Sequence, residues 1–307
     1  MLSMEKFDVV GIGGATVDHL NVVDHFPEED EKTIPKFSSV QGGGQAANAI
    51  ACLARLGAKT AMIGTVGEGS IGQFAIDTLK ENGVNTDCMT VQEGHAPALS
   101  SIIINEEKST RTIVADRGDL KTFPIGDDMY EMIKNARIIH SDAHFPEENM
   151  KLLKFARENG IKICVDAEPH TPNAKDFVKF ADYLIVSRRF VEQLFHHDYE
   201  KALKEFIENG AEIAIITLGK YGAIGMQKGD TTPTTVTEYP VDKVVDTTGA
   251  GDVFHGAFLY GLLQGWDLKK NMRFATVCAG LKCTKIGGRL GAPTFEEAMA
   301  VLDGWSD

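Results

Sequence analysis

Short apolar runs alternate with segments of helical periodicity along most of the chain. The apolar runs, rich in Val and Ile, predict buried strands at Asp8–Gly11, Thr60–Thr65, Ile138–His140, Ile161–Val165, Tyr183–Val186 and Glu212–Thr217. The periodic segments predict helices at Gln45–Leu56, Gly72–Glu81, Glu147–Glu158, Tyr199–Glu208, Ala250–Leu263 and Leu268–Cys283. Such alternation predicts an α/β fold, in which helices cover both faces of a mostly parallel sheet. Ligands of these folds bind at the carboxyl edge of the strands.

Two segments interrupt the alternation. Residues 19–40 and 97–116 lack helical periodicity and carry strand-like runs such as Leu20–Val23 and Ser101–Ile104. We predict that they form a small strand-built lid, which closes over the edge of the sheet and keeps water out. No Pro-rich linker, internal repeat or low-complexity segment divides the chain, so we expect one domain over residues 1–307.

The composition excludes several classes of function. Hydrophobic residues at 43% and charged residues at 24% are ordinary values for a globular protein. The net charge of −13 argues against nonspecific binding to nucleic acid or to an anionic membrane. We find neither a signal-peptide pattern nor an uncharged apolar run near the ~20 residues of a membrane span. The five cysteines include no CxxC pair, so we expect a reduced, cytoplasmic chain without a disulfide framework or a zinc site.

The segment Asp246–Asp252, with the sequence Asp-Thr-Thr-Gly-Ala-Gly-Asp, carries the most specific chemistry. Small residues at a helix start leave the amides of Gly249, Ala250 and Gly251 open to an anion. Asp252 follows them and can accept the proton of an attacking hydroxyl. The helix dipole alone explains an isolated Asp in a first turn, but it does not require a glycine-rich entry. The segment therefore indicates phosphoryl transfer.

Two further segments offer groups for a substrate. Gly42–Asn48 leads into a predicted helix, and the Asn48 amide can both donate to and accept from a polyol. A flexible loop before a tightly packed helix is the alternative for this segment. Asp18 ends a stretch that superficially resembles a dinucleotide fingerprint, but Thr16 replaces the third glycine and no helical pattern follows. We interpret Asp18 as a candidate acceptor for substrate hydroxyls, with a turn aspartate as the alternative.

Other features are less specific. The strand ending at Thr217 runs into a glycine turn, Leu218–Gly222, whose backbone can follow a nucleotide; an ordinary strand-to-turn junction explains it equally well. The chain contains no GxxxxGK[ST] motif, which excludes a P-loop kinase. Cys278 and Cys283 have neither zinc nor redox spacing, which favours a packing role. We interpret His196–His197 as a solvated or capping pair.

Together these residues resemble the PfkB (ribokinase-like) family of carbohydrate and nucleoside kinases. The resemblance covers nearly the whole chain, and the stretch 246–258 is its most specific motif. It implies an α/β/α sandwich with a β-lid that often mediates dimerisation, ATP as donor, Mg²⁺, and often activation by K⁺. The stretches 253–256 and 279–289 are most similar to the sulfofructose kinase branch, and 111–117 to the ketohexokinase branch. Both branches imply a ketose as substrate.

The resemblance also implies roles for the matching residues. The catalytic base is matched by Asp252, and the anion hole by the amides of Gly249, Ala250 and Gly251. The sugar-binding positions are matched by Asp18, Gly43, Gly44 and Asn48. The nucleotide side is matched by Thr217, Gly219 and Gly222, with Ser187 and Cys278 as further candidates. A monovalent-cation site is matched by Asp246 and Thr248, to be completed by carbonyls between Cys283 and Gly291.

One departure from the family concerns the metal. The family often carries an Asn-x-x-Glu motif that helps to organise Mg²⁺ and phosphates, whereas this chain has Ser187-Arg188-Arg189-Phe190. The acid is lost or displaced to Glu192, and Asp166 and Glu168 at a strand end are substitutes. Arg188 is a candidate contact to the phosphates. Arg117, beside the lid, is a candidate contact to a substrate oxygen or anion, with an exposed salt bridge as the alternative.

We therefore expect an ATP-dependent kinase that phosphorylates a primary hydroxyl of a small sugar, either a ketose or ribose. Its expected partners are sugar, ATP with Mg²⁺, and a second copy bound through the lid. A nucleoside kinase of the adenosine or inosine type is the first alternative. The second is a noncatalytic sugar- or nucleotide-binding regulator of the same fold, supported only by the missing acid of the Asn-x-x-Glu motif.

Overall fold

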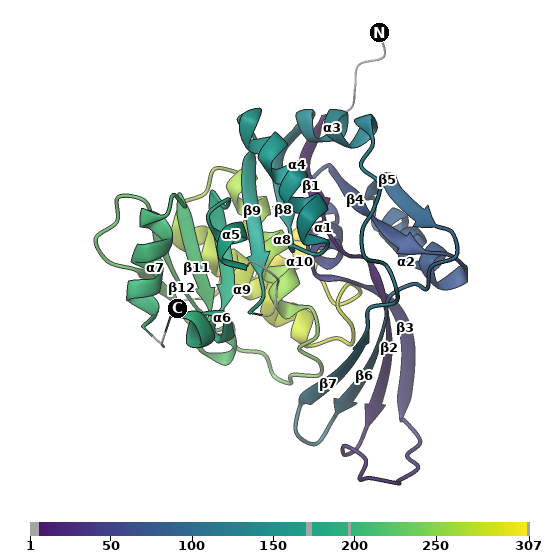
Figure 1. Cartoon of the computed structure of the whole chain (residues 1–307). Helices are drawn as coiled ribbons and strands as arrows, with labels where there is room; N and C mark the ends of the chain where they lie inside the picture. The colour runs from purple at the N-terminus through teal and green to yellow at the C-terminus, as the bar shows by residue number, and fades with distance from the viewer. Residues whose placement is uncertain (1–5, 170–173, 196–197, 306–307) are drawn as a thin grey trace.

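A nine-stranded sheet forms the centre of the computed structural model, which describes residues 6–169, 174–195 and 198–305 (Figure 1). Its strands, in spatial order, are β13 (Thr234–Val236), β12 (Ala223–Gln227), β11 (Ile213–Thr217), β10 (Tyr183–Ser187), β9 (Lys162–Ala167), β8 (Ala136–Ser141), β1 (Phe7–Ile12), β4 (Thr60–Gly67) and β5 (Asn85–Gln92). The pairs from β5 to β11 are parallel, and β12 and β13 continue the sheet antiparallel.

Helices cover both faces of this sheet and create two apolar layers. One face is covered by α1 (Gln45–Arg55), α2 (Ser70–Glu81), α8 (Ala250–Leu263), α9 (Leu268–Cys283) and α10 (Phe295–Leu302). The other face is covered by α3 (Asp127–Lys134), α4 (Pro146–Glu158), α5 (Ala174–Val178), α6 (Arg188–Leu194) and α7 (Tyr199–Glu208). The predicted α/β/α sandwich is therefore confirmed. Among the described helices, none is long and apolar enough to cross a membrane.

The strands are apolar throughout because they are buried on both faces. All eight residues of β4 are buried, as are the first four of β11. A parallel strand covered by helices on both sides has no solvent-facing set, so it shows no alternation of polar and apolar positions. Each of the six predicted strands lies within two residues of an observed strand at both ends.

A second sheet of four strands projects from the main body (Figure 1). It is formed by β3 (Phe37–Gly43), β2 (Thr16–Val23), β6 (Leu99–Asn105) and β7 (Thr110–Asp116), in that order. Leu20, Val22, Ile102 and Ile104 form a small buried apolar cluster in this sheet, and Ile286 of the main body packs against them. The predicted lid segments, 19–40 and 97–116, thus pair with each other through β2 and β6. Strand β2 begins at Thr16, three residues before the first predicted segment.

Strand register brings several chain segments to one edge of the main sheet. Ile12, Ser141 and Val165 are aligned across β1, β8 and β9, and Ser187 pairs with Thr217 across β10 and β11. The residues that follow these positions therefore emerge side by side at the carboxyl edge. This edge and the base of the second sheet contain the candidate site.

Candidate active site

The amino-terminal turns of α1 and α8 lie against each other and join two of the predicted groups. Asn48 Nδ2 donates to Asp252 Oδ2 at 2.7 Å, and Asn48 is buried. The two helices approach closely because α8 carries Gly256, where a Cβ would lie 2.4 Å from the carbonyl oxygen of Ala49. A glycine at this crossing brings the amide of Asn48 within reach of the carboxylate.

The entry to α8 has the backbone geometry of an anion site. Gly249 is the N-cap, with φ 73°, and a Cβ there would lie 2.6 Å from the Cα of Gly288. No side chain caps this helix among the described residues, so its first N–H groups lack a side-chain partner. A Cβ at Gly251 would meet no described atom within 4 Å, which leaves an open approach to these amides. The predicted anion hole is therefore sterically possible.

Asp252 is half-buried, and the loss of solvent around its carboxyl group is the largest influence on its pKa. Burial raises the pKa of Asp252 to about 7, the hydrogen bond from Asn48 opposes this rise, and the charges of Asp18 and Glu168 add to it. A carboxyl group with a pKa near neutrality is suited to accept a proton at physiological pH.

Asp18 lies on β2 and faces the neighbouring strand at Gly43. A Cβ on Gly43 would lie 2.4 Å from both Asp18 carboxylate oxygens, so glycine is required at this position of β3. Burial raises the pKa of Asp18, whereas hydrogen bonding to Ser100 and the charge of Arg289 lower it. Gly42 and Gly43 thus end a strand, which corrects the alternative of a flexible loop before α1.

Arg289 joins these groups and was missed as a candidate contact in the sequence. Its guanidinium is buried and donates to Asn48 Oδ1 at 3.1 Å, to the Gly43 carbonyl at 2.7 Å and to Thr78 Oγ1 at 2.6 Å. It also lies within electrostatic range of Asp18 and Asp252. The signal was available, because Arg289 directly follows two glycines in the stretch 279–289, which resembles one branch of the family.

Three acidic side chains, Asp142, Asp166 and Glu168, line the carboxyl ends of β8 and β9. Asp142 Oδ2 accepts from the amides of Gly14 and Ala46 at 3.2 and 3.1 Å, which ties the start of α1 to the sheet. Gln45 Nε2 lies 3.5 Å from Asp166 Oδ2 and 3.3 Å from Glu168 Oε1. Burial raises the pKa of Asp166 well above its ordinary value, and the charges of Asp252, Glu168 and Asp142 add to the rise.

The predicted nucleotide-side residues lie farther along the same edge. Ser187 and Thr217 are paired at the ends of β10 and β11, and the Ser187 hydroxyl caps α6 by accepting from the Phe190 amide at 3.3 Å. Gly219 is exposed with φ 62°, and a Cβ there would meet no described atom within 4 Å. Gly222 has φ 84°, and a Cβ there would lie 2.0 Å from the Val236 carbonyl oxygen. The turn therefore requires glycine at this position.

Two candidates are not brought into this arrangement. Cys278 is fully buried in the apolar layer of α9, so its thiol has no access to a nucleotide and the packing interpretation of this residue is correct. Arg117 is exposed just beyond β7, and no ion pair joins it to a described residue. The pair His196–His197 lies outside the described residues.

Comparisons with known proteins decide the family. A model of the pfkB family carbohydrate kinases matches residues 6–294. The chain belongs to the PfkB family of carbohydrate kinases, which are ATP-dependent phosphotransferases. The match spans both sheets and every part of the site described above.

Individual relatives of this PfkB kinase cover nearly its whole length. It is 29% identical to a ribokinase of Lactococcus lactis over 95% of each chain. It is 27% identical to a ketohexokinase of Mus musculus over 91% of this chain and 97% of the relative. The structure of an Arabidopsis thaliana ribokinase complexed with ribose and ATP has the same fold, with a TM-score of 0.83 and 23% identity over 98% of this chain and all of that one.

The PfkB resemblance implies Mg²⁺, and the acidic edge fits such an ion. Asp166 and Glu168 offer carboxylate oxygens on one strand end, and magnesium prefers hard oxygen ligands. The like charges of these acids raise the pKa of Asp166, and a divalent cation would relieve that repulsion. Glu192, the other candidate acid, lies on α6, where its Oε1 accepts a 3.2 Å hydrogen bond from Tyr199.

The monovalent-cation site expected at Asp246 and Thr248 does not fit K⁺. Asp246 Oδ1 accepts from the amide and hydroxyl of Thr248 at 2.8 and 2.7 Å, and Oδ2 accepts from the Gly287 amide at 2.8 Å. Its carbonyl oxygen accepts from Lys282 Nζ at 2.6 Å. Two unit charges of the same sign 4 Å apart repel by about 4 kcal/mol at an effective dielectric constant of 20. A second cation on these oxygens is therefore disfavoured, which corrects the expectation.

Proposed function

We propose that this PfkB kinase transfers the γ-phosphoryl group of ATP to a primary hydroxyl of a small, uncharged sugar, either a ketose or ribose. The observation that carries the proposal is the Asn48–Asp252 hydrogen bond beside the open amides of α8. This bond supports Asp252, whose pKa is about 7, as a base beside an anion site, and phosphoryl transfer to a hydroxyl needs both elements.

In the proposed reaction, Asp252 accepts the proton of the sugar hydroxyl while its oxygen attacks the γ-phosphorus. The bond from that phosphorus to the β,γ-bridging oxygen breaks, and ADP leaves. The amides of Gly249, Ala250 and Gly251 stabilise the negative charge that develops on the phosphoryl oxygens. Mg²⁺, held beside Asp166 and Glu168, would neutralise charge on the phosphates when it is bound.

The sugar is proposed to lie between Asp18, Asn48 and Asp252. Gly43 leaves room for the Asp18 carboxylate and Gly44 for the Gly14 carbonyl, and the second sheet would close as a lid to exclude water. Thr217, Gly219 and Ser187 are proposed to flank the nucleotide, with Arg188 as an exposed positive charge nearby.

An uncharged acceptor is favoured by the electrostatics of this region. Asp18 and Asp252 are both acidic, and the buried guanidinium of Arg289 already donates to three protein groups. Arg111 on β7 donates to Thr247 Oγ1 at 2.5 Å. Of the two lid arginines, this leaves the exposed Arg117 to pair with an anionic group on a sugar.

A substrate panel tests the proposal. ADP release is measured with Mg²⁺-ATP and fructose, sulfofructose, ribose, glucose, a sugar acid, adenosine or inosine. We expect turnover with a ketose or with ribose, and weaker turnover with the nucleosides. Arg117→Gln is measured in parallel on fructose and sulfofructose. The proposal of an uncharged acceptor would be contradicted if the wild type preferred sulfofructose and Arg117→Gln abolished that preference. The acceptor would then be an anionic sugar.

We also propose a cytoplasmic homodimer that forms through the second sheet. Exposed apolar side chains gather on its strands: Phe37 is 49%, Val40 53%, Ile113 46% and Val114 64% exposed. Exposed apolar surface of this kind is typical of protein interfaces. Sedimentation of the wild type and of Val40→Glu tests the assembly, and a wild type that sediments as a monomer excludes it.

A further inference from the structure

The side chain of Lys282 is fully enclosed beneath the entry to α8. It lies on the last turn of α9 with 0% exposure, and its Nζ is 2.6 Å from the Asp246 carbonyl oxygen and 3.9 Å from Asp246 Oδ2. The backbone of Gly291 covers it closely, because a Cβ at Gly291 would lie 3.1 Å from Lys282 Cε. A lysine is rarely buried without a partner, so this placement indicates a specific task.

That task follows from what Asp246 holds in place. Its two carboxylate oxygens bind Thr248 on one side and Gly287 on the other. Thr248 directly precedes the N-cap glycine of α8, and Gly288 supports that glycine from behind. The ammonium group of Lys282 thus contacts Asp246, the first residue of the loop that presents the anion-binding amides.

We propose that the Lys282 ammonium is a built-in cation, which orders the 246–251 loop and lets this kinase work without a monovalent ion. The proposal rests on the proposed function, because the loop is the anion site of that reaction. Lys282 contacts neither substrate nor reacting atoms in this account and acts by positioning Asp246 and the loop. The two carboxylate oxygens and the carbonyl oxygen of Asp246 already accept hydrogen bonds from N–H and O–H donors of the protein.

The first test compares wild-type protein in KCl, NaCl and choline chloride at equal ionic strength. We expect the same kcat and the same thermal unfolding midpoint in all three salts. A wild type whose kcat and midpoint both rise specifically with K⁺ overturns the proposal without any variant. The unfolding midpoint does not depend on turnover, so it still reports on the cation if the panel finds no substrate.

The second test removes the charge and empties the space that the side chain fills. Lys282→Ala should lower kcat by about 10- to 100-fold, the usual effect of removing a group that orients a site. K⁺ or NH₄⁺ should then restore part of kcat and raise the midpoint, because the vacated space can accept a cation. The matched control is Lys285→Ala, at a side chain that is 49% exposed and lies 4.0 Å from Glu297. A Lys282→Ala protein that folds but shows no response to K⁺ in either measurement contradicts the proposal.

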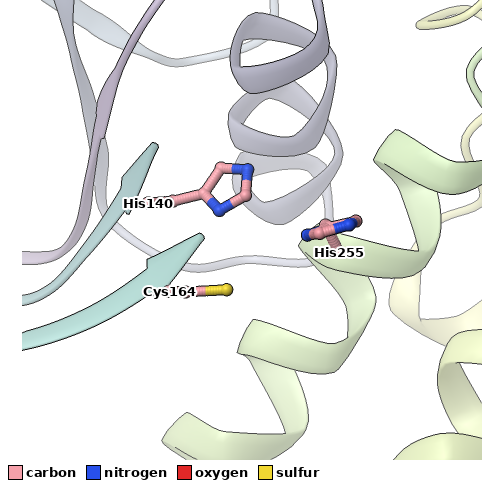
Figure 2. Close-up of side chains that lie close together, drawn as sticks. All are labelled: His140, Cys164 and His255. Atoms are coloured by element: carbon pink, nitrogen blue, oxygen red, sulfur yellow. The ribbon is translucent and has the colours of Figure 1, made fainter. Parts of the chain in front are cut away.

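A second inference concerns a cluster behind Asp252, formed by His140 on β8, Cys164 on β9 and His255 on α8 (Figure 2). All three side chains are buried, and one ligand atom from each lies within 4.8 Å of the others. Both ring nitrogens of His140 and Nδ1 of His255 have no hydrogen-bond partner in the described structure. Buried polar atoms without a partner are rare in folded proteins and call for an explanation such as an ion.

The chemistry of the cluster matches a soft divalent cation. His140 and His255 each offer a buried ring nitrogen without a hydrogen-bond partner in the described structure, and such a nitrogen can donate a lone pair to a metal ion. Two imidazoles and a thiolate are typical zinc ligands, and Asp166 Oδ1 lies 3.6 Å from His255 Nε2 as a fourth. Zinc binds cysteine as the thiolate, so binding would release the Cys164 proton to solvent.

We infer that His140, Cys164, His255 and Asp166 form a site for Zn²⁺ or a similar soft cation. Tetrahedral bonds of about 2.0–2.3 Å require the ligand atoms to move closer together than they are here. The ion would take Asp166 away from the acidic edge proposed for Mg²⁺, so its binding would inhibit the kinase. This inference is independent of Lys282, and its binding test is independent of turnover.

Cobalt spectroscopy tests this site directly. Co²⁺ added to the wild-type protein should bind with one equivalent and give a thiolate-to-cobalt charge-transfer band. Zn²⁺ should abolish the band by displacement. Cys164→Ser should lack it, and Cys88→Ser, a buried cysteine on β5, should keep it. A wild type without the band refutes the site, and so does a folded Cys164→Ser protein that still shows it.

Discussion

Asn48 Nδ2 donates a 2.7 Å hydrogen bond to Asp252 Oδ2 across 204 residues of sequence. The bond joins two helix starts that each follow a glycine-rich segment. It also links the groups proposed for the sugar to the group proposed for the chemistry.

The rate should rise with pH as Asp252 loses its proton, because only the carboxylate can accept one. Its pKa is raised to about 7, so kcat/KM should increase through neutrality and level off above it. Asn48 lowers this pKa, and Asn48→Leu should therefore move the rise to higher pH. Asn159→Ala, on the surface at the end of α4, is the control. An unchanged profile in Asn48→Leu would argue against the coupling.

Gly43→Ala should weaken sugar binding. The new Cβ would lie 2.4 Å from the Asp18 carboxylate oxygens, so Asp18 must move. We expect KM for the sugar to rise by about 10-fold or more, the scale of losing one well-placed hydrogen bond, with KM for ATP unchanged. Gly304→Ala, where the nearest described atom is 3.9 Å away, should leave both values unchanged. A variant with normal sugar KM would remove Asp18 from the sugar site.

The acidic edge makes a prediction about magnesium. Asp166→Asn and Glu168→Gln should each raise the Mg²⁺ concentration needed for half-maximal rate, because each removes a hard oxygen ligand. Glu192→Gln should not, since that side chain bonds to Tyr199. A magnesium titration at fixed ATP measures all three. If Glu192→Gln alone raised the Mg²⁺ concentration needed for half-maximal rate, Glu192 on α6 would be the metal-binding acid.

Arg289 and Arg137 should differ greatly in their contributions to stability. Arg289→Met removes a buried guanidinium that bonds to Asn48, Gly43 and Thr78, and should cost about 3–5 kcal/mol of unfolding free energy. Arg137→Met removes an exposed ion pair with Asp8 at 3.2 Å and should cost less than about 1 kcal/mol. Urea unfolding monitored by circular dichroism measures both. Equal losses would show that the buried hydrogen bonds of Arg289 contribute no more to stability than the exposed ion pair of Arg137.

Much of the fold was predictable because its strands are buried on both faces. Continuous Val and Ile runs located β1, β4 and β8–β11, and helical periodicity gave the observed bounds of α7, α8 and α9. Two of the missed strands have weaker patterns. Strand β5 mixes polar and apolar residues, and β13 has three residues, too few to show a period.

The candidate site was predictable only where local sequence carries the chemistry. Asp252 and its glycine entry follow from one helix start, whereas Arg289 acts through contacts with residues more than 200 positions away. The role of Lys282 was hidden for the same reason. In sequence it is one residue of a periodic helix, and only the fold places its ammonium against Asp246.

Transfer of phosphate by the wild type and by Asp252→Asn, measured as ADP release on the best sugar of the panel, tests the central claim most directly. Asn keeps the size of the side chain but cannot accept the proton. We expect kcat to fall by about 10²- to 10⁴-fold while ATP affinity, measured by calorimetry, stays the same. An Asp252→Asn protein that retains near-normal turnover would contradict the assignment of Asp252 as the base.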